Sequence, residues 1–193
     1  MQQRALRCSL PIGLALTLLA SSPLSLGLAA RAHDLPPAIS DQEFWRVLTE
    51  SSETGGVFPR EFMSNEDSAQ FVIPTLKDTA RPGGVYIGVG AEQNFTYIAA
   101  VKPRLAFIVD IRRDNMLQHV MYKALFELSE DRSEFVSRLF SRKRPIGIGG
   151  TSSVTALFDA YRAIAPDLTL FQENVRAVLD RLVRIRQFQF LLN

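Results

Sequence analysis

Two glycines and one aspartate are the residues of this chain whose types and spacing could do chemistry. Gly88 and Gly90 lie at the end of an apolar run that starts at Val85, and a helical pattern follows them. A second apolar run, 105–109, ends in Asp110, twenty-two residues after Gly88. A strand, a glycine turn, a helix and a second strand that ends in an acid form the half-site that holds an adenosine-type cofactor.

The residues around the glycines narrow the class of cofactor. The pattern Gly88-x-Gly90-x-x-Gln93 has no third glycine, which a dinucleotide fingerprint uses for close packing of helix on strand. Glu92 stands at the expected helix start, where a carboxylate repels a phosphate. NAD and FAD therefore fit poorly, whereas S-adenosylmethionine carries no phosphate. Asp110 could accept hydrogen bonds from both of its ribose hydroxyls.

These residues also carry a resemblance to known proteins. The stretch GVYIGVG at 84–90, together with Asp110, resembles the first two cofactor motifs of class I S-adenosylmethionine-dependent methyltransferases. More narrowly, 83–97, 107–113 and 121–126, with Ser64-Asn65-Glu66 upstream, are similar to an uncharacterised bacterial family assigned a methyltransferase-like fold. The resemblance implies a Rossmann-like α/β fold and cofactor-binding roles for Gly88, Gly90 and Asp110.

Two further residues complete the candidate cofactor site, and its chemistry stays open. Glu92 borders the glycine turn, and Asn65 follows a loop that could fold over the ligand. No strand-end Asn/Asp-Pro-Pro-Tyr motif marks a methyl-acceptor site, so no catalytic residue is assigned. The structural alternative is a tight glycine turn, with Asp110 capping the next helix. A further alternative is an exported, non-catalytic module or inactive fragment that uses the same crevice for another small ligand.

The N-terminus predicts a secretory signal peptide over 1–32. Arg4 and Arg7 precede a long uncharged, apolar stretch, and Ala30-Arg31-Ala32 supplies small residues at the spacing that signal peptidase requires. An uncleaved membrane anchor is the alternative, but Pro11 and Pro23 interrupt the span. We therefore expect an exported protein, periplasmic or extracellular, with no stable membrane span after cleavage. S-adenosylmethionine is made inside the cell, and this conflict keeps the non-catalytic alternative open.

Removal of the leader changes what the composition indicates. The leader contains three arginines and no acidic residue, so its loss turns the net charge of +2 slightly negative and removes any argument for nucleic-acid binding. The only cysteine, Cys8, leaves with it, so we expect neither a disulfide nor a thiolate metal site.

His119 is the one histidine of the predicted domain 41–193. It fits a core or boundary position, and no metal site is predicted.

The predicted elements give one incomplete domain. After a linker at 33–40, the domain 41–193 starts with two helices, at 40–52 and from Ser64, the second of which Pro74 is expected to kink. Two strands, a helix at about 94–101 and several later helices follow. Two parallel strands cannot form a stable open sheet, so we expect a Rossmann-like methyltransferase-type domain with an N-terminal helical cap, truncated at its C-terminus. Asn115 is expected at a solvated helix start, with a contact of Arg113 or Asn115 to the adenosine as the alternative, and the arginines of the last helix, including Arg186, are expected in solvent.

Overall fold

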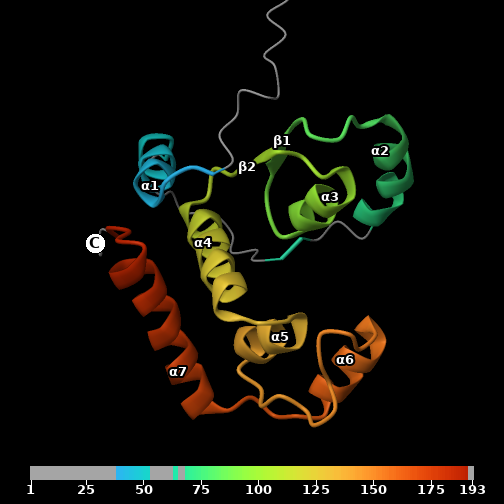
Figure 1. The fold of residues 1–193 in the computed structure, drawn as a ribbon, viewed down its shortest axis with the longest axis vertical. Helices are drawn as coiled ribbons and strands as arrows, with labels where there is room; N and C mark the ends of the chain where they lie inside the picture. The colour runs from blue at the N-terminus through green and yellow to red at the C-terminus, as the bar shows by residue number, and fades with distance from the viewer. Residues whose placement is uncertain (1–37, 53–62, 65–67, 191–193) are drawn as a thin grey trace, which may run out of the picture. The chain divides into compact units, whose positions relative to one another are not determined.

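The computed structural model describes residues 38–52, 63–64 and 68–190. The predicted signal peptide, most of the predicted linker and Asn65 lie outside the described residues. Figure 1 shows the order of the elements, from α1 (Asp41–Glu50) to α7 (Leu168–Leu179) and the π-helical turn η3 (Asp180–Ile185). Among the described residues, no helix combines the length and the apolar character that crossing a bilayer requires.

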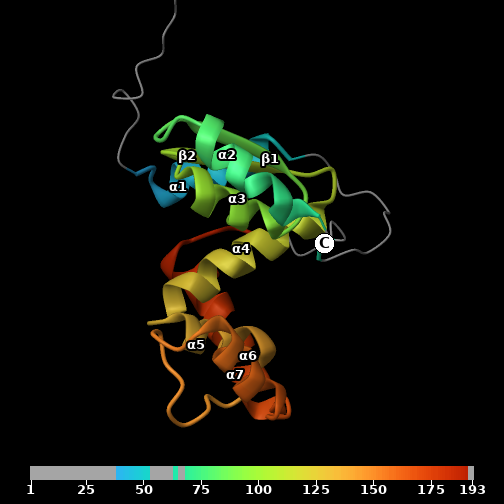
Figure 2. The ribbon, with the colours of Figure 1, turned by 90° about the vertical axis from the view of Figure 1, so that its right-hand side faces the viewer.

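A small α/β unit carries the predicted glycine turn. The strands β1 (Val85–Val89) and β2 (Leu105–Val109) pair in parallel, and α3 (Gln93–Val101) forms the crossover between them. A 3₁₀ turn, η2 (Ala69–Val72), leads into α2 (Ile73–Thr79), which packs beside α3 (Figure 2). These two strands are the whole sheet within the described residues, so the Rossmann-like assignment stays a prediction.

Within the described part of the chain, the sheet is covered on one face. Tyr86 and Gly88 of β1 lie on the side of α3, where Gly88 is buried. The alternate side chains form what we call the outer sheet face, which is exposed to solvent. Its members are Val85, Ile87, Val89, Phe107 and Val109. Since parallel strands are normally covered on both faces, the open outer face is unusual for such a unit.

Beyond β2 the described chain is helical, as the sequence predicts. The remaining helices are α4 (Arg113–Leu128), α5 (Arg132–Phe140) and α6 (Val154–Arg162), followed by α7 and η3. Side-chain oxygens of Asp131, Ser153 and Asp167 accept hydrogen bonds from first-turn amides of α5, α6 and α7. Such caps define where each helix begins, because they satisfy amides that have no partner inside the helix.

The first helix and the end of the chain meet in one apolar core. Phe188 is 1% exposed, and its ring stacks on Trp45 and Phe44 of α1, with centroids 4.9 and 5.6 Å apart. Val120 of α4 and Leu182 of η3 complete this core. Arg186 joins the same elements, since its guanidinium binds Asp41 and Glu127 at 2.9 Å. The expectation that Arg186 lies in solvent is therefore wrong.

Most predicted element bounds are close to those in the structure, and one helix start is not. Ser40 caps α1 as expected, since its hydroxyl accepts from the amide of Glu43. The second helix, however, begins at Ile73 rather than at Ser64. Pro74 lies in its first turn, where no amide is needed, instead of kinking a longer helix.

Candidate functional site

The candidate site lies at the carboxyl edge of β1 and β2. The amide of Gly90 donates to the carbonyl of Val109 at 3.1 Å, which extends the strand pairing by one residue. Gly90 has φ +92°, a conformation that strains any residue with a side chain. The chain then leaves β1 for α3, while Asp110 follows directly after β2. The structure thus places Gly90 and Asp110 side by side at the edge where parallel sheets bind ligands.

Asn115 of α4 links the two strand ends. Its Nδ2 donates to the carbonyl of Gly90 at 2.7 Å and to Oδ2 of Asp110 at 2.9 Å. Both partners are acceptors, which fixes the orientation of the side-chain amide. Nδ2 donates to them, and Oδ1 remains as the acceptor atom of the Asn115 side chain. Asn115 is 3% exposed, which makes the expectation of a solvated helix start wrong for this residue. A buried amide therefore holds the glycine turn against the acid.

Asp110 is already hydrogen-bonded within the protein. Oδ1 accepts from the backbone amide of Arg112 at 2.8 Å, and the Arg112 guanidinium lies 3.2 Å from each carboxylate oxygen. Burial raises the pKa of the Asp110 carboxyl, but the hydrogen bonds from Arg112, its positive charge and the bond from Asn115 outweigh burial and leave the pKa below 3.8. Asp110 is therefore ionised at neutral pH, and a ligand hydroxyl would have to displace the Arg112 side chain.

Gly88 has a packing role that the sequence did not reveal. A Cβ at this position would lie 1.9 Å from Oδ1 of Asn94 and 2.6 Å from the hydroxyl of Tyr86. These two atoms hydrogen-bond to each other at 2.7 Å directly over the glycine. The amide of Asn94 also donates to the carbonyls of Val89 and Ala91. The inner face of Gly88 is thus filled by side chains of the protein itself and leaves no room there for a ligand.

Glu92 is held near the turn by a different contact. Both oxygens of its carboxylate lie 3.0 Å from the backbone amide of Ser64. The acid at the start of α3 therefore ties down the segment before α2, and it keeps negative charge at the helix start where a phosphate would otherwise bind. Asn65, the other predicted site residue of this region, lies outside the described residues.

Three side chains next to Gly90 each keep one buried acceptor that has no partner among the described residues. His119 Nε2 lies 3.1 Å from the carbonyl of Gly90, so Nε2 carries the proton and Nδ1 is left as an acceptor. Nδ1 of His119, Oδ1 of Asn115 and Oε1 of Gln93 are buried and make no hydrogen bond in the described structure. Buried acceptors without a donor are costly, so this edge favours a group that brings N–H or O–H donors.

A cavity of about 320 Å³ adjoins the same histidine. Its lining is mainly apolar and comes from α3, β2 and α4: Phe95, Ile108, His119, Lys123, Phe126 and Glu127. Lys123 and Glu127 form an ion pair at 2.7 Å on its rim. Among the described residues, no group of three or more His, Cys, Asp or Glu side chains could hold a metal ion.

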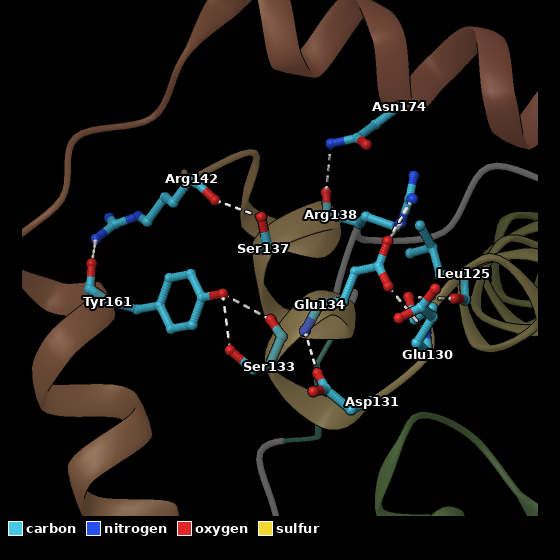
Figure 3. A network of polar contacts seen from close by, with 11 residues as sticks. Leu125, Glu130, Asp131, Ser133, Glu134, Ser137, Arg138, Arg142, Tyr161 and Asn174 are labelled. Carbon is cyan, nitrogen blue, oxygen red and sulfur yellow. Dashed lines mark hydrogen bonds and ion pairs between the residues drawn. The ribbon is translucent and has the colours of Figure 1, made fainter. Parts of the chain in front are cut away.

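A second polar cluster joins α5, α6 and α7, but its groups satisfy one another (Figure 3). The buried hydroxyl of Tyr161 donates to the carbonyl of Ser133 at 2.6 Å. Asn174 donates to the carbonyl of Arg138, while Glu134 pairs with the Arg138 side chain. These bonds pair most polar groups of the cluster with one another. An open cavity of about 530 Å³ adjoins Glu134, Arg138 and Asn174, but the polar atoms of these three side chains already have partners within the protein.

Comparison with known proteins gives one match. Residues 62–147 fit the model of a family described as a domain of unknown function, DUF7790. No curated protein and no solved structure matches the chain significantly. The matched segment contains Gly88, Gly90, Asp110, Asn115 and His119, so the chain is similar to this family over the whole of the candidate site.

Proposed function

We propose that the carboxyl edge of the sheet binds S-adenosylmethionine or S-adenosylhomocysteine, and that the protein is methyltransferase-like. The observation that carries the proposal is the double hydrogen bond of Asn115, which fixes the glycine turn beside an ionised strand-end acid. Such a pair at the ends of two parallel strands suits an adenosine group. Glu92 at the start of α3 disfavours phosphate, which supports this ligand over a dinucleotide.

The residues that fit the ligand are Asp110, Gly90, Asn115 and His119. The Asp110 carboxylate would accept from the two ribose hydroxyls once the Arg112 guanidinium moves away. Oδ1 of Asn115 and Nδ1 of His119 are buried acceptors without a partner in the described structure. They would take further donors, such as the α-ammonium of the ligand, once the side chains that cover them move away. Gly90 lets the backbone come close. Gly88 has no contact role, because Asn94 covers it.

The described residues support binding more strongly than catalysis. The ligand would supply an activated methyl group, and the protein would contribute by aligning that carbon with an acceptor. No described side chain at the edge is assigned as a general base, since the one unpaired nitrogen, Nδ1 of His119, is closed to solvent. We therefore assign Asp110 as a ligand-binding residue and leave the acceptor open.

Calorimetric titration of the purified protein tests the proposal. S-adenosylhomocysteine is expected to bind wild type, and Asp110→Ala is expected to abolish the heat. Asp114→Ala, which removes an exposed acid one turn away, is the matched control and should bind like wild type. Arg112→Ala is expected to bind more tightly by several-fold, because the guanidinium no longer competes for Asp110.

Three outcomes contradict all or part of the proposal. Equal binding by wild type and Asp110→Ala would place the ligand elsewhere. Binding of adenosine without binding of either methionine derivative would support the non-catalytic nucleoside module and remove the methyltransferase-like part. Absence of heat with all three ligands, for protein with a cooperative melt, would leave the glycine turn and Asp110 as structural features.

A further inference from the structure

The helix α7 has two apolar faces, and within the described residues one of them packs into the core while the other is exposed. Val178 of α7 and Leu182 of η3 pack into the core against α4, which runs beside α7 (Figure 1). The second face is what we call the α7 stripe: Phe171, Val175, Leu179 and Val183, which are 52%, 40%, 53% and 46% exposed. Residues four apart lie on one face of a helix. A continuous apolar stripe in solvent indicates a missing partner.

A row of polar and charged residues runs along one side of this stripe. Its members are Gln172, Arg176, Asp180 and Arg184, which lie at intervals of four, one position after the members of the stripe. The row carries charges of both signs, and Asp180 binds Arg184 at 2.9 Å. A row with both signs can complement itself when a second helix runs in the opposite direction.

We propose that the α7 stripe is a homodimer interface in which two copies of α7 pack antiparallel about a twofold axis level with Val178. That axis interleaves Val175 with the partner's Leu179 and the partner's Val183, and it places the two copies of Leu179 next to each other. It brings Arg176 opposite the partner's Asp180 in the flanking row. Rows of residues at intervals of four pack into each other in the commonest class of helix pair. The contact is the same on both subunits, as twofold symmetry requires.

The charges favour a second copy over other occupants. A helix that lies on a membrane surface carries an excess of Lys and Arg on its polar side, whereas Asp180 stands within this row between Arg176 and Arg184. Within the described residues, the α7 stripe therefore combines exposed apolar side chains with a row of charges that can complement a second copy of itself.

Sedimentation velocity of the purified full chain over roughly 1 to 100 μM tests the interface. Wild type is expected to dimerise. Leu179→Glu is expected to weaken the dimer roughly a hundredfold or more, because it buries an unpaired charge at the axis. Ile146→Glu introduces the same charge at an exposed apolar residue of a turn and should dimerise like wild type. A wild type that stays monomeric, or a Leu179→Glu dimer of unchanged strength, overturns the proposal.

Charge exchange tests the antiparallel register. Arg176→Glu and Asp180→Arg each place like charges opposite one another twice per dimer, so each should weaken dimerisation roughly tenfold. The double variant restores opposite charges and should recover most of the lost affinity. A double variant no stronger than the singles overturns the register, and monomeric protein that binds anionic vesicles instead identifies a membrane surface as the occupant. Melting curves of all the variants exclude unfolding as the cause.

Discussion

The carboxyl edge of the sheet and the cluster between α5 and α7 are both buried and polar, but they satisfy their polar groups differently. Four buried side-chain N and O atoms of the described residues have no partner, and three of them belong to Gln93, Asn115 and His119, whose side chains lie next to Gly90. In the helical cluster, only Nε of Arg142 remains unpaired among the described residues. A closed cluster stabilises a fold, whereas an edge with unmet acceptors is suited to a ligand.

The largest expected difference in unfolding free energy is between alanine substitutions of two glycines, Gly88 at the sheet edge and Gly147 in the loop between α5 and α6. Gly88→Ala puts a methyl group 1.9 Å from Oδ1 of Asn94, so the hydrogen bonds of Asn94 and Tyr86 must break. We expect a loss of roughly 3–5 kcal/mol in the free energy of unfolding. Gly147→Ala meets no atom within 4 Å and carries only the strain of its φ of +79°, about 1 kcal/mol. Urea unfolding measures both.

Equal losses for the two alanine variants would contradict this account of Gly88. The position would then be an ordinary turn with a mobile Asn94, and its inner face would again be available to a ligand. The measurement therefore also decides whether Gly88 belongs to the packing of α3 or to the binding site.

The sequence predicted those parts of the site that depend on local patterns. The apolar runs, the glycines and Asp110 identify both strands and the turn, because strand and turn propensities act over a few neighbouring residues. Asn94 and Asn115 look like ordinary polar residues near helix starts, yet both are buried by tertiary contacts. Their roles depend on Gly88 and Gly90 lying opposite them in space, which no spacing along the chain reveals.

Long-range contacts explain the remaining differences from the sequence-based expectations. Arg186 has the pattern of a solvated helix residue, but its partner Asp41 is 145 positions earlier in the chain. The sequence pattern continues the last helix to about Gln189, whereas the structure ends its helical part at Ile185, and the burial of Phe188 beyond that end depends on Trp45. A pairing between the two ends of a domain has no local signal. The assignment of a Rossmann-like fold and a truncated end likewise stays a prediction.

A pair of aromatic substitutions should give the opposite order for the two regions, at smaller magnitude. Tyr161→Phe removes the donor to the buried carbonyl of Ser133 and should cost about 1–3 kcal/mol. His119→Phe removes an unpaired acceptor, while Asn115 still donates to Gly90, so we expect a change within about 1 kcal/mol. Denaturant unfolding of the two variants checks this order. A larger loss for His119→Phe would mean that Nδ1 has a partner in solution and that the edge is closed.

The smallest expected effect concerns the acid sensitivity of the helical cluster. The backbone amide of Glu130 donates to the Glu134 carboxylate, and this bond, with the bonds and charge of Arg138, outweighs burial and holds the pKa of Glu134 below 4.5. A carboxyl whose folded pKa is lowered stabilises the protein above its unfolded pKa and loses that contribution as pH falls through the folded pKa. We expect Glu134→Gln to be less stable than wild type by up to about 1 kcal/mol at pH 7.

Unfolding free energies measured from pH 7 down to about 3 would check this prediction. The wild-type advantage over Glu134→Gln should shrink once the pH falls below 4.5, because the wild-type side chain becomes neutral as well. Glu50→Gln, which breaks an exposed ion pair of α1 with Arg46, is the matched control and should change stability little at any pH. An advantage that stays constant to the lowest pH would show that Glu134 acts by hydrogen bonding without titrating. The cluster between α5 and α7 would then be held by neutral contacts, so that ionised groups matter mainly at the edge where Asp110 lies.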